Sequence, residues 1–158
     1  MAYPFGTYSD EVIDALRKCG ICYSRTVVST GNFSFPKEWL TLHPTCHHNN
    51  PNLMGLAKHF VEDTSTQPSE NWLFYVWGHS YEFDQDNNWH VMEEFAEYVS
   101  HRDDIWYATN IEVYDYVKAY ESLQVSVDES IIHNPTAIDV WFWKNGTTHC
   151  IKGGETFY

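Results

Sequence analysis

Basic residues are scarce in this chain. Of its 158 residues, 9 are Lys or Arg and 22 are Asp or Glu, which gives a formal net charge of −13. Nucleic acids and anionic membrane surfaces are bound by clustered Lys and Arg, so the charge disfavours both as partners. The aromatic content is 17%, and a neutral ligand such as a sugar fits an aromatic-rich, acidic surface better.

Long apolar runs are absent as well. No stretch of 18 apolar residues occurs, which argues against a membrane-spanning helix. Residues 1–12 have neither the basic segment nor the apolar segment of a secretion signal. We therefore expect a cytoplasmic chain.

Cysteines are few and irregularly spaced, at Cys19, Cys22, Cys46 and Cys150. Cys19 and Cys22 form a C-x-x-C pattern, but Cys19 ends a helix-like stretch, whereas a redox motif places its first cysteine at a helix N-terminus. We expect reduced, mostly structural cysteines. A redox or zinc-binding role for the pair is the less favoured alternative.

Helix-like and strand-like patterns alternate along most of the chain. The spacing of apolar residues predicts helices at 8–21, 51–63, 87–101 and 110–123, strands at 21–28, 40–46, 71–77 and 104–109, and a polar connector at 64–70. This alternation predicts an α/β fold with a largely parallel sheet. The last part of the chain instead has short strand patterns and an Asn-Gly hairpin signal, which predict a β-rich segment.

Local signals predict where the helices begin and end. Ser9 is the expected N-cap of the first helix and Gly20 its C-terminal stop. Pro51 fits the first position of the second helix, and Asn110 the N-cap of the last. The continuous apolar run 71–77 predicts a strand buried on both faces.

Three polar clusters follow predicted strand ends. They are residues 3–8, 44–50 and 78–84. In parallel sheets and barrels, functional groups gather at the carboxyl ends of the strands. We therefore expect the three clusters to lie together and to form the site.

The strings "AYPFG", "HPTCHH" and "YVWGHSYEFD" within these clusters resemble the C-terminal half of a polysaccharide deacetylase of the NodB-homology type, carbohydrate esterase family 4. The resemblance extends from Ala2 to the end of the chain and is specific to a bacterial branch of the family. It implies a distorted (β/α) barrel, similar to a TIM barrel, of which residues 1–121 form the C-terminal half. Residues 122–158 are then a β-rich extension packed on it. The family hydrolyses N-acetyl groups of amino sugars with a divalent metal, zinc or similar, held by an Asp and two His.

The resemblance also implies roles for individual residues. His79 matches the family's general acid, at the end of a late strand. The backbone N–H of Phe5 takes the place of an oxyanion donor. His47 or His48 orients the acid, and Ala2 stands where the family has an Arg.

Several residues near His79 are candidates for binding substrate. Trp77 and Trp89 are candidate platforms for sugar rings, because both border polar loops. Glu82, or Asp84, would stabilise the protonated imidazole of His79. His47 and His48 belong to the same substrate-binding set. For Trp141 and Trp143, a core strand and an exposed aromatic patch both remain open.

The family's metal ligands and general base should precede the region of resemblance, and no residues before Tyr3 match them. We therefore expect no confidently bound metal and half of a barrel that is incomplete for hydrolysis alone. A zinc site built from Cys46, His47 and His79 is a less favoured possibility. The alternative function is a non-catalytic carbohydrate-binding or assembly module. An open sheet edge at residues 1–6 further predicts a homo-oligomer.

Overall fold

The protein is described by a computed structural model that covers residues 1–63 and 71–158, so the predicted connector 64–70 lies outside the described residues. The chain forms two compact units, unit 1 at Met1–Trp106 and unit 2 at Tyr107–Tyr158. Both mix helices with small sheets, which confirms the α/β class. Within the described ranges, no helix is long and apolar enough to cross a membrane. The proposed boundary between residues 121 and 122 stays a prediction.

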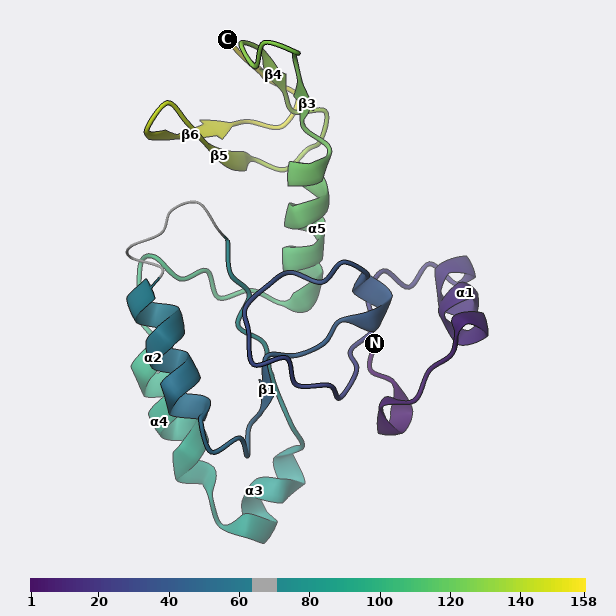
Figure 1. Ribbon diagram of the computed structural model, residues 1–158, viewed down its shortest axis with the longest axis vertical. Helices are drawn as coiled ribbons and strands as arrows, with labels where there is room; N and C mark the ends of the chain where they lie inside the picture. The colour runs from purple at the N-terminus through teal and green to yellow at the C-terminus, as the bar shows by residue number, and fades with distance from the viewer. Residues whose placement is uncertain (64–70) are drawn as a thin grey trace. The chain divides into compact units, whose positions relative to one another are not determined.

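Unit 1 consists of helices around short parallel strand pairings (Figure 1). Its elements are η1 (Pro4–Gly6), α1 (Asp10–Lys18), η2 (Trp39–Thr41), β1 (Cys46–His47), α2 (Leu53–Asp63), β2 (Val76–Trp77), α3 (Ser80–Asp86) and α4 (Trp89–Val99). Helices α2 and α4 lie side by side.

Parallel pairing in unit 1 involves more residues than the named strands. Ala2 pairs with Arg25 and Arg25 with Leu42, both in parallel, and β1 pairs in parallel with β2. The predicted strands at 21–28 and 40–46 therefore exist as short extended segments rather than full strands. The pairing is parallel as predicted, so the carboxyl ends of these segments point the same way, but it is limited to these short segments, and the described residues form several small sheets and no closed barrel.

The core of unit 1 joins the strands to the helices. Phe33, Cys46, Leu53 and Leu56 are buried together, and side chains of β2 and α4 pack against them. Within 71–77 only two residues form a strand, and all seven are exposed or half-buried. The expectation of a strand buried on both faces is wrong, because only alternate residues of this run pack against the cluster.

The helix ends follow capping chemistry, with two shifts from the predictions. Ser9 accepts a hydrogen bond from the Val12 N–H, at 3.4 Å, and caps α1 as predicted. Helix α2 begins at Leu53 instead of Pro51, which lies in the preceding turn. The last helix, α5 (Asn110–Glu121), is capped by Thr109 rather than by Asn110.

The Thr109 cap explains the second shift. Glu112 Oε2 accepts a hydrogen bond from the Thr109 N–H at 2.7 Å, while Thr109 Oγ1 faces the Glu112 N–H at 3.5 Å. This reciprocal pair is a capping box, which satisfies two otherwise free donors. Residues 104–109 before it contain no strand, so that prediction is wrong: this stretch leads into the cap instead of pairing in a sheet.

Unit 2 contains α5 and the β-rich segment. Its strands are β3 (Gln124–Val125), β4 (Ile132–His133), β5 (Val140–Lys144), β6 (Thr147–Ile151) and β7 (Thr156–Phe157). Strands β3, β4 and β7 form one antiparallel sheet, and β5 pairs with β6. The predicted hairpin is confirmed, because Asn145 and Gly146 adopt φ of 52° and 80° between β5 and β6. A two-residue turn of this kind requires positive φ at both positions.

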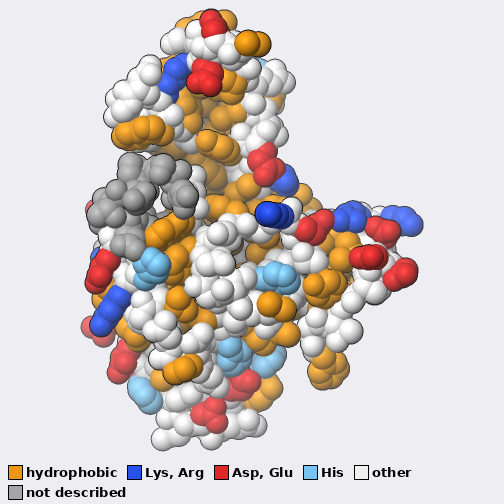
Figure 2. Space-filling view, viewed as in Figure 1, with side chains coloured by type: hydrophobic (Ala, Val, Ile, Leu, Met, Phe, Trp, Pro, Cys, Tyr) orange, Lys and Arg blue, Asp and Glu red, His pale blue; other side chains and the backbone are white. Residues whose placement is uncertain are grey.

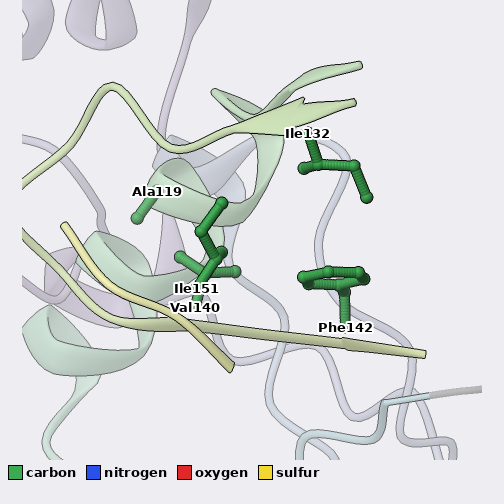
Figure 3. Close-up of a cluster of buried hydrophobic side chains, with 5 residues drawn as sticks. All are labelled: Ala119, Ile132, Val140, Phe142 and Ile151. Atoms are coloured by element: carbon green, nitrogen blue, oxygen red, sulfur yellow. The ribbon is translucent and has the colours of Figure 1, made fainter. Parts of the chain in front are cut away.

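The core of unit 2 is apolar. Ala119 of α5, Ile132 of β4, Val140 and Phe142 of β5, and Ile151 of β6 are buried together (Figure 3). Alternation along β5 buries Val140 and Phe142 and exposes Trp141 and Trp143. Of the two readings for these tryptophans, the exposed aromatic patch is correct.

Candidate functional site

Two histidines lie where β1 and β2 end. His47 is the last residue of β1 and pairs with Trp77, the last residue of β2. The backbone N–H of His48 donates to the carbonyl oxygen of Trp77 at 2.8 Å and continues the pairing by one residue. Because the strands are parallel, the residues that follow each of them meet at this edge. Two of the three predicted clusters, 44–50 and 78–84, are thereby brought together.

The imidazole of His48 is the most confined group of this site. The side chain is only 2% exposed, and its ring lies 4.3 Å, between centroids, from that of Phe83. Its Nδ1 edge faces Gly78, where a Cβ atom would come within 1.8 Å of Nδ1. Among the described residues, neither ring nitrogen of His48 has a hydrogen-bond partner.

Glu82 connects the start of α3 to both histidines. Its Oε2 accepts a hydrogen bond from the backbone N–H of His79 at 3.1 Å, as a capping glutamate does. The same oxygen lies 3.3 Å from His47 Nε2 and 3.6 Å from His48 Nε2. One carboxylate oxygen thus faces one nitrogen of each ring.

The state of His47 follows from its surroundings. Its Nδ1 accepts a hydrogen bond from the Asn49 N–H at 3.2 Å. In the neutral ring the proton therefore sits on Nε2, toward Glu82. Burial lowers the pKa of His47, the neighbouring His48 lowers it further, and Glu82 opposes the shift. The balance favours a neutral imidazole, the form that binds metals.

His47, His48 and Glu82 could hold a metal ion. Their ligand atoms all lie within 4.8 Å of one another. Two imidazole nitrogens and one carboxylate oxygen are a donor set that zinc and similar divalent ions accept. The buried, unpartnered nitrogen of His48 fits a bound cation, so the residues present suit the metal that the family resemblance implies.

His79 lies beside this group with an exposed side chain. Its imidazole stacks on the ring of Tyr81, with centroids 5.3 Å apart. Glu82 binds the backbone of His79, and Asp84 accepts a hydrogen bond from Trp89 Nε1 at 2.8 Å. The expected pairing of the imidazole with either carboxylate is therefore not formed in the part of the chain that the structure describes.

The two tryptophans predicted to bind sugar differ in accessibility. The ring of Trp77 is covered by the guanidinium of Arg25, 4.3 Å from its centroid, and has His47 at its edge. Its Nε1 is buried without a hydrogen-bond partner among the described residues. Trp89 is 48% exposed and leans on Phe83, with centroids 4.7 Å apart. Trp89 offers a free surface, whereas Trp77 forms a wall of the histidine site.

Phe5 is not brought to this site by any contact recorded among the described residues. It is 99% exposed and adopts φ of 56°, in the left-handed region, within η1. Next to it, Gly6 packs so closely on Val27 that a Cβ would come within 2.3 Å of a methyl group. The first polar cluster thus packs against the segment after Arg25 through Gly6.

Cys46 takes the structural position that was predicted for most of the cysteines. Cys46 belongs to the buried cluster of unit 1, and burial raises the pKa of its thiol to about 11, so it stays protonated. The possible zinc set of Cys46, His47 and His79 is not formed, because adjacent residues of β1 face opposite ways. Cys19 and Cys22 are free and exposed.

Sequence reasoning did not identify the partners that confine His48. Phe83 and Gly78 have this role; both lie in the predicted cluster 78–84, but neither was given a role there. The signal for Glu82 was present, since a glutamate three residues after the helix-capping position is the capping-box pattern. Figure 2 shows histidine side chains beside acidic ones on the face of unit 1 near α3.

Comparison with known proteins gives no relative. No family model, no curated protein and no solved structure matches the chain.

Proposed function

We propose that the chain is a polysaccharide deacetylase-type protein of bacterial carbohydrate metabolism. It would form the C-terminal half of a NodB-like distorted barrel and take part in hydrolysing N-acetyl groups of amino-sugar polymers. The observation that carries the proposal is the position of His79 beside His47, His48 and Glu82, at the common carboxyl end of β1 and β2. This is where parallel α/β folds place their chemistry.

The proposed roles follow from accessibility. The exposed imidazole of His79 donates a proton to the amine that leaves when the amide bond breaks. The role of the Phe5 backbone N–H as oxyanion donor stays a prediction from the resemblance, because no contact among the described residues brings Phe5 to His79. A divalent metal, when bound, supplies Lewis acidity toward the acetyl carbonyl and makes water a better nucleophile.

A second candidate function is sugar binding without hydrolysis. Trp141 and Trp143 are 57% and 54% exposed on the same side of β5, and Trp89 is exposed on α4. Exposed indole rings stack on the apolar faces of sugars, and neutral polymers are not repelled by a net charge of −13. The chain would then hold the polymer for a partner that performs the reaction.

The test uses the full chain with oligomers of N-acetylglucosamine and added zinc. Acetate release and oligomer binding are measured together, for the natural chain and for His79→Gln. The matched control is His90→Gln, which changes an exposed histidine of α4. Release that His79→Gln lowers at least tenfold, with binding retained, supports the hydrolase. Binding without release supports the sugar-binding module, and neither binding nor release overturns both.

A homo-oligomer is part of the same proposal. In the described chain, Ala2 pairs with Arg25 alone, which leaves the other side of this segment as a sheet edge open to a second copy. Sedimentation analysis at micromolar concentration should show a dimer or larger species. A stable monomer would remove this part of the proposal.

A further inference from the structure

We propose that His47, His48 and Glu82 form a zinc site with three protein ligands and an open fourth position. The ligand atoms are Nε2 of each histidine and Oε2 of the glutamate. None of these residues corresponds to the Asp and two His that the family resemblance implies as metal ligands. The site would belong to this chain's own residues.

The distances fit one small ion. Ligands that bind zinc tetrahedrally, at about 2.0–2.1 Å, lie about 3.3 Å from each other. His47 Nε2 is 3.3 Å and His48 Nε2 is 3.6 Å from Glu82 Oε2. The two rings are near neighbours, with centroids 4.3 Å apart, so only small movements would bring all three atoms to zinc.

His48 supplies the independent indication of a ligand. A buried polar atom normally has a hydrogen-bond partner, because leaving it unpaired is costly. The His48 side chain is only 2% exposed, and yet its Nε2 has no hydrogen-bond partner among the described residues, since the carboxylate oxygen of Glu82 lies 3.6 Å away, beyond hydrogen-bond distance. A cation between the two groups satisfies both. Gly78 closes the Nδ1 side of the ring, so Nε2 is the nitrogen turned to the ion.

The surroundings hold the glutamate in place. The backbone N–H of His79 donates to Glu82 Oε2 and fixes the carboxylate against the start of α3. Such outer contacts orient metal ligands and preserve their geometry. The indole N–H of Trp77, in edge contact with His47, is a second buried donor without a partner among the described residues.

Zinc binding has a specific consequence at Asn49. The Asn49 N–H donates to His47 Nδ1, which keeps the ring proton on Nε2. A metal at Nε2 needs the other tautomer, with the proton on Nδ1, and the Asn49 N–H must then turn away. The amide resonance of Asn49 should therefore shift when zinc binds, whereas zinc held elsewhere leaves it unchanged.

This inference rests on the proposed function for the use of the metal, but its test reads binding and not hydrolysis. Zinc binding without acetate release would support the proposed zinc site and contradict the proposed hydrolase activity. Acetate release by a chain that binds no zinc would do the reverse.

The experiment titrates the metal-free, untagged full chain with zinc by calorimetry, and with cobalt followed by visible absorption. The variants are Glu82→Gln and His47→Gln, which keep size and remove a ligand. The control is His90→Gln, which removes an exposed histidine of the same unit. Circular dichroism confirms that each variant is folded.

We expect one zinc ion per chain with a dissociation constant in the micromolar range or below, and cobalt absorption typical of four-coordinate nitrogen and oxygen ligands. Each ligand variant should weaken binding at least tenfold, and the control should not. The inference is overturned if the folded chain binds no zinc, if Glu82→Gln binds as tightly as the natural chain, or if the Asn49 amide does not respond.

Discussion

Asn134 of unit 2 and His48 of unit 1 are both polar side chains that are almost completely buried, and their hydrogen-bond partners differ. Asn134 in unit 2 is 0% exposed: its amide donates to the carbonyl oxygens of Ile138 and Ile151, at 2.8 and 3.3 Å, and its Oδ1 accepts from the N–H and hydroxyl of Thr136. His48 in unit 1 is nearly as buried, at 2%, and neither ring nitrogen has a hydrogen-bond partner among the described residues.

The comparison separates a structural polar residue from a binding one. Asn134 uses all of its hydrogen-bonding capacity within the fold and ties the turn after β4 to β6. His48 instead leaves two buried ring nitrogens without hydrogen bonds among the described residues, which is unfavourable for folding. If position 48 only filled space, an apolar side chain there would serve the stability of the fold about as well.

The largest effect should come from Asn134→Ala. The change leaves several buried groups without partners, and each such loss costs about 1–3 kcal/mol, so the free energy of unfolding should fall by about 3 kcal/mol. Urea unfolding followed by tryptophan fluorescence measures it. A loss under about 1 kcal/mol would mean that this network does not hold unit 2 together.

Gly78→Ala should be next in size. The added methyl group would come within 1.8 Å of the His48 ring. Overpacking of this kind costs about 1–3 kcal/mol, so urea unfolding should show a loss of about 2 kcal/mol, together with weaker zinc binding. The double variant Gly78→Ala, His48→Ala should recover part of the stability, because the clash is removed. If the double variant recovers no stability, the loss in Gly78→Ala does not come from a clash with the His48 ring.

A smaller effect is expected for His48→Leu in the metal-free chain. No hydrogen bond is lost, so the free energy of unfolding should change by less than about 1 kcal/mol in either direction. The stabilisation that zinc gives the natural chain should disappear, since binding to the folded state is its source. Thermal unfolding with and without zinc measures both. A large loss without metal would make His48 structural, like Asn134.

The smallest effect is expected for the pH dependence of folding stability that comes from Asp128 in unit 2, a carboxylate that accepts several hydrogen bonds. The Ser126 hydroxyl and the N–H and hydroxyl of Ser130 donate to it and hold its pKa at about 2. A lowered pKa stabilises the folded state above the unfolded value of about 3.8, and this contribution fades as the pH falls toward 2. Carbon-detected NMR titration gives the pKa, and Ser126→Ala should raise it. A pKa of Asp128 that is not lowered in the folded chain would contradict the role given to the hydrogen bonds from Ser126 and Ser130.

The local parts of the fold were the predictable ones. The cap at Ser9, the Asn-Gly turn and the apolar faces of α2 depend on neighbours in sequence, and the patterns identified them. The lengths of the strands were not predictable, because pairing depends on partners far along the chain. The run 71–77 reads as a fully buried strand, yet its residues are exposed or half-buried, and only Val76–Trp77 form the strand β2.

The sequence indicated which residues belong to the candidate site better than it indicated how their side chains are arranged. His47, His48, Glu82 and His79 were all named from the sequence, through the polar clusters near predicted strand ends and the family resemblance. The arrangement depends on the turn from β2 into α3. This turn places the Glu82 carboxylate toward the two imidazole rings and lets the His79 backbone N–H donate to it. Phe5 was expected in the same place, but its exposed turn packs through Gly6 onto Val27 instead.

The hydrogen bond between the His79 N–H and Glu82 gives one carboxylate two tasks. The Glu82 carboxylate caps the start of α3. It is also the acidic member of the group His47, His48 and Glu82 that could hold a metal among the described residues. Occupancy of the site and order in the first turn of α3 are then thermodynamically linked: whatever draws the carboxylate away loosens the helix, and whatever holds it there tightens the helix. Amide hydrogen exchange at the start of α3 would thus report the state of the pocket from the backbone alone.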